Sequence, residues 1–132
     1  MSTLVIDTIQ GRASANSINV RGEGSNNTNL QQGLAKVWAN TSGVGTPALA
    51  DSFNVASVAD RGTGVETFTF TTAMSNINFS TQALSDHNTE GVTVQIVPDF
   101  ANTTTTSTLS SVNTGGTARD TDKSILIHGD LA

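Results

Sequence analysis

The residues best suited to chemistry in this chain stand together in the segment SDHNTEG, which contains Asp86, His87 and Glu90. Two carboxylates and an imidazole are possible zinc ligands, but a zinc site needs three or four converging N, S or O atoms. Short acidic loops of this composition are also common on protein surfaces. A solvated hairpin loop explains the segment, so we assign no metal and no cofactor.

Catalytic motifs are absent from the sequence. A Ser-His-Asp triad is recognised by geometry, so the presence of His128 among many serines does not indicate one. The chain has no GxSxG nucleophile motif and no P-loop. Asp120 and Asp122 do not have the spacing of an EF-hand loop. We therefore expect a protein that is not an enzyme and has no catalytic residues.

Composition excludes several classes of partner. The formal net charge is −5, and the six Lys and Arg residues are scattered, so no basic patch is available to bind nucleic acid. No apolar run approaches the length that spans a membrane. The first residues do not have the pattern of a secretory signal, so we expect none. The absence of Cys excludes disulfides and thiolate ligands.

The elements that must position any functional residue are predicted to be β-strands. Thr, Ser and Asn supply 47 of the 132 residues, and these residue types disfavour helices. Apolar and polar residues alternate in several segments, which is typical of half-buried strands. The sequence predicts an all-β fold: a single antiparallel β-sandwich of about seven strands over residues 34–132. The predicted strands lie in LAKVWAN, DSFNVASVA, VETFTFTT, NINFSTQAL, GVTVQIV, NTTTTSTLSSVN and KSILIHGD.

The segment at residues 51–74 has the clearest alternation. Phe53 and Val55 are expected on one face, and the apolar phase slips before Val58, which indicates a β-bulge or a strand end. DRGTG is predicted to be a turn because its glycines can adopt positive φ. Phe68 and Phe70 are expected in the core.

Two further predictions concern the later part of the chain. Ile77 and Phe79 are expected to alternate along one strand, and the phenylalanines in general are interpreted as core. The segment GGTARDTDK is expected to be an exposed loop.

Residues 1–33 are predicted to form an extended N-terminal arm. Isolated apolar residues stand among Gly, Asn and Ser, so this segment cannot offset its ordering entropy by its own burial. We expect it to lie on a neighbouring subunit or on a larger assembly. The candidate contact residues are Leu4, Val5, Ile6, Ile9, Val20, Leu30 and Trp38.

Trp38, the only Trp, has two interpretations, a core residue or an anchor at a subunit contact. Tyr is absent, and sugar-binding sites normally use exposed aromatic rings. This scarcity of aromatic residues argues against a dedicated glycan-binding protein.

The segment QQGLAKVWANTSGVGTPALADSFNVASVADRGTGVETFTFTTAMSNINFS resembles a module that recurs in structural and tail-fibre-type proteins of bacteriophages, especially marine phages and cyanophages. In that family a similar lead-in precedes a GTG-containing loop, a DSFNVSS-like strand, a DNGTG-like turn and an FTTAM-like segment. Here Arg61 replaces the more familiar Asn of the turn, and Phe79 stands where Tyr is common. The closing ILIHGD resembles the last strand of the family, which usually has an aromatic residue near the position of His128. The opening MSTLVIDTIQG is similar to the start of many virion proteins.

The resemblance implies a virion protein without enzymatic activity, which forms a homotrimer with two further copies of itself. It would contact the major capsid protein or a tail or adaptor protein through its arm, as a capsid decoration (cement) protein or a short fibre. The alternative is a tail-fibre receptor-binding protein, in which residues 85–91 and 102–114 would contact a host-surface glycan.

Overall fold

A computed structural model describes residues 3–12, 18–21, 24–86, 91–96 and 101–132. The chain divides into two compact units, Met1–Leu34 and Ala35–Ala132. We call them the N-terminal unit and the sandwich unit. The division falls one residue after the end of the predicted arm.

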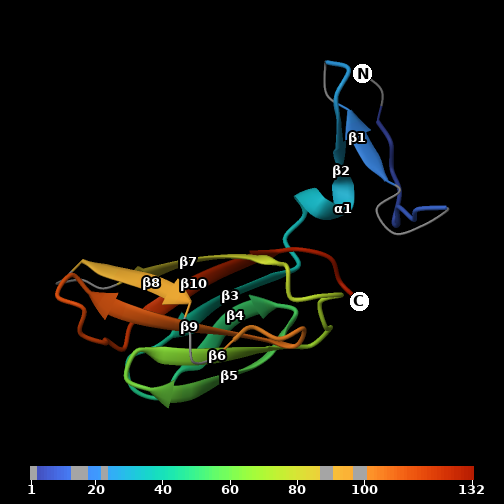
Figure 1. Ribbon diagram of the computed structural model, residues 1–132. Coiled ribbons are helices and arrows are strands. Elements are labelled where there is room, and N and C mark those ends of the chain that lie inside the picture. The colour runs from blue at the N-terminus through green and yellow to red at the C-terminus, as the bar shows by residue number, and fades with distance from the viewer. Residues whose placement is uncertain (1–2, 13–17, 22–23, 87–90, 97–100) are drawn as a thin grey trace. The chain divides into compact units, whose positions relative to one another are not determined.

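The sandwich unit is built of two four-stranded antiparallel sheets (Figure 1). Sheet I has the order β4-β3-β10-β7, and sheet II has the order β5-β6-β9-β8. The predicted all-β antiparallel sandwich is therefore confirmed. The strands of sheet I are β3 (Val37–Ser42), β4 (Ala48–Phe53), β7 (Ser80–Asp86) and β10 (Asp122–His128). Those of sheet II are β5 (Val55–Gly62), β6 (Val65–Phe70), β8 (Val92–Ile96) and β9 (Thr106–Asn113).

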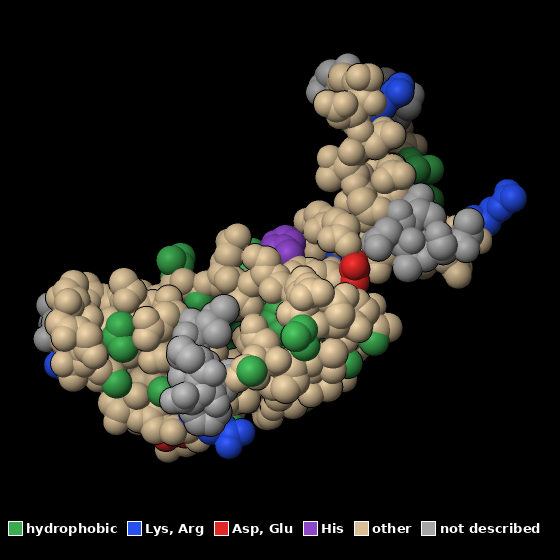
Figure 2. Space-filling model, viewed as in Figure 1, with side chains coloured by type: hydrophobic (Ala, Val, Ile, Leu, Met, Phe, Trp, Pro, Cys, Tyr) green, Lys and Arg blue, Asp and Glu red, His purple; other side chains and the backbone are tan. Residues whose placement is uncertain are grey.

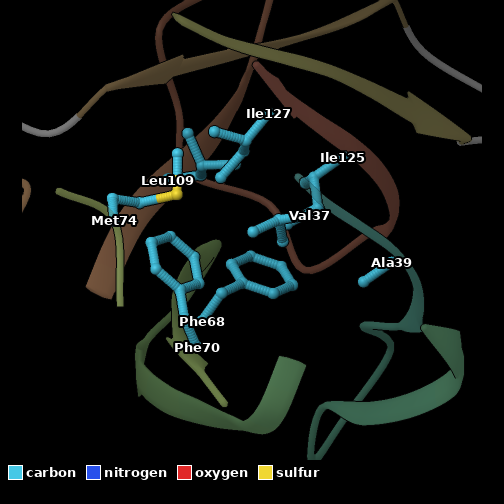
Figure 3. Packing of buried hydrophobic residues seen from close by; sticks show 8 residues of the cluster. All are labelled: Val37, Ala39, Phe68, Phe70, Met74, Leu109, Ile125 and Ile127. Atoms are coloured by element: carbon cyan, nitrogen blue, oxygen red, sulfur yellow. The ribbon is translucent and has the colours of Figure 1, made fainter. Parts of the chain in front are cut away.

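The apolar core lies between the two sheets (Figure 3). Alternate residues of β3 and β10 point inward from sheet I, and Phe68 and Phe70 point inward from β6. The ring of Phe70 meets that of part-buried Phe79 edge to face, with centroids 5.9 Å apart, a favoured aromatic geometry. Both Phe68 and Phe70 are buried, as predicted. The buried cluster consists of Val37, Ala39, Phe68, Phe70, Met74, Leu109, Ile125 and Ile127.

In its described residues the sandwich unit has eight strands rather than about seven, because the predicted strand DSFNVASVA is divided at Asn54. This residue adopts φ 59°, so β4 ends before it and β5 begins after it in the other sheet. Its side chain stabilises the crossing: Oδ1 accepts a hydrogen bond from the Thr72 amide at 2.6 Å, and Nδ2 donates to the Lys36 carbonyl at 3.1 Å. The prediction that Phe53 and Val55 share a face is therefore wrong.

Other details of the β5–β6 hairpin follow the sequence. The register shifts between Val55 and Ser57, which confirms the predicted irregularity. In the turn, Gly62 has φ 123° and Gly64 has φ 74°. A Cβ on Gly64 would lie 2.6 Å from the Ser111 carbonyl oxygen, so both backbone conformation and space require glycine there.

Two predicted core or loop assignments are wrong. Ile77 is 58% exposed because β7 begins only at Ser80. The end of the predicted exposed loop GGTARDTDK is part of the interior: Thr121 and Lys123 are buried, at 0% and 1% exposure. Strand β10 begins at Asp122, and its alternation directs Lys123 inward.

The N-terminal unit contains a hairpin and one helical turn. Strand β1 (Asn19–Arg21) pairs antiparallel with β2 (Asn27–Asn29), and α1 (Leu30–Gly33) follows directly. The Asn29 side chain caps α1 by accepting a hydrogen bond from the Gln32 amide at 3.0 Å. No residue of β1, β2 or α1 is buried.

Candidate functional site

The predicted contact residues of the N-terminal unit are exposed. Leu4 is 79% exposed, Val5 87%, Ile6 48%, Ile9 57% and Val20 50%. Exposed apolar side chains that lie close together in the sequence are candidates for contact with another molecule. Figure 2 shows the molecule with side chains coloured by type, including the hydrophobic side chains at the surface.

The hairpin of the N-terminal unit is small and exposed in the part of the chain that the structure describes. Its sheet has only two strands of three residues each, with every residue of β1 exposed. An isolated two-stranded hairpin is marginally stable in water. Each of the two strands has one neighbour in this sheet, so both are edge strands, to which another strand can add.

The remaining two predicted contact residues have different positions. Leu30 is part-buried at the start of α1, and its amide donates to the Ile18 carbonyl at 2.9 Å, so it holds the hairpin to the helical turn. Trp38 belongs to the sandwich unit. In β3 it alternates with the buried Val37 and Ala39, so its part-buried ring lies on the outer face of sheet I and not in the core.

Trp38 has apolar neighbours on that outer face. It is directly opposite Phe53 on β4 and Leu126 on β10. Phe53 is 50% exposed. Leu84 on β7, opposite Ser124, is 76% exposed. We call Phe53, Trp38, Leu126 and Leu84 the apolar stripe. Of these four residues, the sequence predicts only Trp38 as a candidate contact, and its alternation assigns Phe53 to the core.

The outer face of sheet II carries a hydrogen-bonded group of polar side chains, together with the part-buried Val65 and Val112. Thr67 alternates with the inward-pointing Glu66 and Phe68, and its hydroxyl is 2.7 Å from that of Thr108 on β9. The Arg61 Nε donates to the Thr67 hydroxyl at 3.2 Å. These side chains bind one another, which distinguishes this face from the apolar stripe.

An ion pair is buried between the two sheets. Lys123 Nζ and Glu66 Oε1 are 2.7 Å apart, with side-chain exposures of 0% and 3%. The Thr41 hydroxyl donates to Glu66 Oε2 at 3.3 Å, and Lys123 Nζ also donates to the Thr121 carbonyl at 3.4 Å. Gly43 leaves the room for this cluster: a Cβ there would lie 1.9 Å from the Thr121 carbonyl oxygen. The pair joins β6 to β10 across the interior.

A second lysine side chain is also largely removed from water. Lys36 precedes β3 and is 5% exposed. Burial lowers the pKa of its ammonium group from the ordinary value of 10.5, and the nearby Asp130 carboxylate partly opposes this shift.

The candidate metal motif cannot be placed, since His87 and Glu90 lie outside the described residues. His128 is the last residue of β10 and is part-buried. Among the described residues, no group of three His, Asp or Glu side chains is arranged to hold a metal ion. In the same part of the chain no helix has the length and apolar character needed to cross a membrane.

The geometry therefore offers two candidate contact surfaces: the exposed apolar side chains of the N-terminal unit and the apolar stripe on sheet I. The pairing of the strands is sufficient to establish the β-sandwich on which the stripe lies. In comparisons with known proteins, no family model, no curated protein and no solved structure matches this chain.

Proposed function

We propose that this chain is a non-enzymatic structural protein of a bacteriophage virion. It forms a homotrimer that decorates the capsid as a cement protein, or forms a short fibre, and it attaches through its N-terminal unit. The resemblance of residues 30–80 to a module of phage structural proteins is the reason for naming a virion.

The exposure of the apolar residues at positions 4–9 is the observation that carries the proposal. A surface that is apolar and separate from the core needs a binding partner. The partners in the proposal are the neighbouring subunits and the major capsid protein, or a tail or adaptor protein. Specific docking requires about 800 Å² of buried surface on each partner.

The role that follows is mechanical. An arm bound across a subunit boundary holds together subunits that internal pressure would otherwise separate. Added strands would also cover the open edges of the hairpin and of the sandwich. Closed cyclic symmetry would make each copy both donor and acceptor of such contacts.

The test is to measure the copy number per virion by quantitative mass spectrometry of purified particles, with the major capsid protein as the internal reference. A copy number comparable to that of the capsid protein indicates a decoration protein. A small multiple of three indicates a short fibre on the tail. Absence from purified particles would overturn the proposal.

Receptor recognition is the second candidate. The observation in its favour is the exposed ring of Phe53 beside Trp38, because aromatic rings of this kind stack on sugars and anchor interfaces. Binding of the purified protein to host cells, at a level that competes with phage adsorption, would support it over a purely structural role.

A further inference from the structure

We propose that the apolar stripe on sheet I is the docking site for residues 4–9 of a second copy of this chain. The inference rests on the proposed function, in which the N-terminal unit binds neighbouring subunits, and it names the surface that the unit binds.

The apolar stripe crosses all four strands of sheet I. Phe53, Trp38 and Leu126 are direct neighbours on β4, β3 and β10, and Leu84 on β7 lies diagonally from Leu126. A shallow depression of about 270 Å³ lies beside its aliphatic end, lined by Gln82, Leu84 and Leu126 among others. It offers room for a branched aliphatic side chain.

Residues 4–9 match this end of the stripe in spacing. In an extended chain the side chains of Leu4 and Ile6 point to the same side, about 7 Å apart. Diagonal neighbours on adjacent antiparallel strands, such as Leu126 and Leu84, are also separated by about 7–8 Å. An extended Leu4–Val5–Ile6 therefore places two aliphatic side chains against two aliphatic side chains.

Charge favours the N-terminal segment over the face of a second sandwich as the occupant. Residues 35–132 carry four Lys and Arg against nine Asp and Glu, whereas residues 1–34 carry two of each. Asp51 and Asp122 are exposed on the outer face of sheet I, beside the stripe. Two such faces in contact would bring four carboxylates together, whereas the neutral N-terminal unit brings Arg12 and no net charge.

The chemistry of the stripe also favours an apolar peptide over a glycan. Aromatic rings that could stack on a sugar lie at the other half of the stripe, where Phe53 and Trp38 have the polar Asn40 and Asp51 beside them. The half of the stripe formed by Leu126 and Leu84 offers aliphatic carbon, with an exposure of 76% at Leu84. Aliphatic side chains are matched by Leu and Ile, which residues 4–9 supply.

Cysteine cross-linking tests the contact directly, because the chain contains no Cys of its own. Two single variants of the full chain, Ile6→Cys and Leu84→Cys, are mixed and oxidised, and disulfide-linked peptides are quantified by mass spectrometry. The matched control replaces Leu84→Cys by Val44→Cys, since Val44 is 72% exposed but lies outside the stripe. We expect the Ile6–Leu84 disulfide to exceed the Ile6–Val44 disulfide at least tenfold.

Three results would overturn the inference. The first is equal yields for the two pairs. The second is a double variant, Ile6→Cys with Leu84→Cys, that forms only the disulfide within one chain. The third is an oligomer by light scattering, or a virion-bound protein, that forms no Ile6–Leu84 disulfide; in that case the proposed function stands and only the docking site is wrong.

A second measurement does not depend on disulfide geometry. Leu84→Asp changes an exposed side chain, so the sandwich stays folded, and we expect the oligomeric fraction at fixed concentration to fall about tenfold, with Val44→Asp unchanged. Unchanged oligomerisation of Leu84→Asp would contradict the inference. Loss of host-cell binding with unchanged oligomerisation would assign the stripe to a receptor instead.

Discussion

Removal of one partner of the buried ion pair should strongly destabilise the sandwich unit. In Lys123→Met, the Glu66 carboxylate would remain 3% exposed with only the Thr41 hydroxyl at 3.3 Å. Glu66→Leu would likewise leave the Lys123 ammonium with the Thr121 carbonyl at 3.4 Å. Breaking a buried pair by removing one partner costs about 3–5 kcal/mol, because an uncompensated charge stays in the interior. We expect the free energy of unfolding of each single variant to be lower than that of the wild type by this amount.

The double variant Glu66→Leu with Lys123→Met should behave differently. Two unit charges 2.7 Å apart attract by about 6 kcal/mol at an effective dielectric constant of about 20. The desolvation of two ions costs several kcal/mol each, so the two terms nearly cancel. Replacing both charges by apolar groups removes both terms. We expect the free energy of unfolding of the double variant to lie within about 2 kcal/mol of the wild-type value. The double variant should therefore be more stable than either single variant.

Urea unfolding followed by the fluorescence of Trp38, the only Trp, measures these free energies. The quantity that decides is the coupling energy: the change in the double variant minus the sum of the single changes. If the free energy of unfolding of a single variant lies within about 1 kcal/mol of the wild-type value, the charge of the remaining partner is not left buried without compensation. Additive single changes would show that Glu66 and Lys123 do not interact.

Four further predictions concern the rest of the chain. Phe68→Ala should cost about 3–5 kcal/mol in urea unfolding, whereas Phe53→Ala, on a half-exposed ring, should cost under about 1.5 kcal/mol; equal losses would contradict the assignment of Phe53 to the outer face. Gly43→Ala should lower the midpoint of thermal unfolding sharply, because its Cβ would meet a main-chain oxygen 1.9 Å away. The folded state lowers the pKa of Lys36, so at pH values between this lowered pKa and 10.5 the unfolded chain binds more protons than the folded chain. The stability of the wild type relative to Lys36→Met should therefore increase as the pH rises through this window. A stability difference that stays constant with pH would contradict this prediction. Deletion of residues 1–33 should leave the circular dichroism and the cooperative unfolding of the sandwich intact, because the entire buried cluster lies beyond them, and should abolish oligomerisation and virion attachment.

The alternation of apolar residues was sufficient to predict the class of fold. Phe68 and Phe70 alternate with threonines on β6, and a period of two with Thr-rich outer positions is incompatible with a helix. The turn between β5 and β6 was also predictable, since Gly62 and Gly64 carry the positive φ angles that the turn needs. Local chemistry determines these features, so a single sequence reports them.

The error at Phe53 has a different origin. A period of two assigns Phe53 and Val55 to one face only if the strand continues between them. Asn54 adopts a left-handed conformation instead, and partners from Lys36 and Thr72 hold its side chain. Those partners are distant in sequence, so the local pattern contains no sign that the chain changes sheet. Phe53 is for this reason absent from the predicted contact residues, since a residue assigned to the core is not expected at a contact.

The burial of Lys123 could not be predicted for the same reason. In TARDTDKS a lysine among polar residues is typical of an exposed loop, and its partner Glu66 is 57 residues away. Lysine is rarely fully buried unless it is paired, so the location of Lys123 depends on a contact between residues that are distant in sequence.

The interior of the sandwich explains why function must be sought on its surfaces. At one end the sheets are joined by Phe68, Phe70 and the aliphatic cluster, and at the other by the Glu66–Lys123 pair. Charged groups in such a pair are engaged with each other, and no described histidine or third carboxylate accompanies them in a metal-binding group. The apolar area left over is on the outside, at residues 4–9 and along the apolar stripe. If residues 4–9 of one copy dock on the stripe of the next, as we propose, both apolar surfaces are buried between copies, and a closed ring leaves neither of them in water.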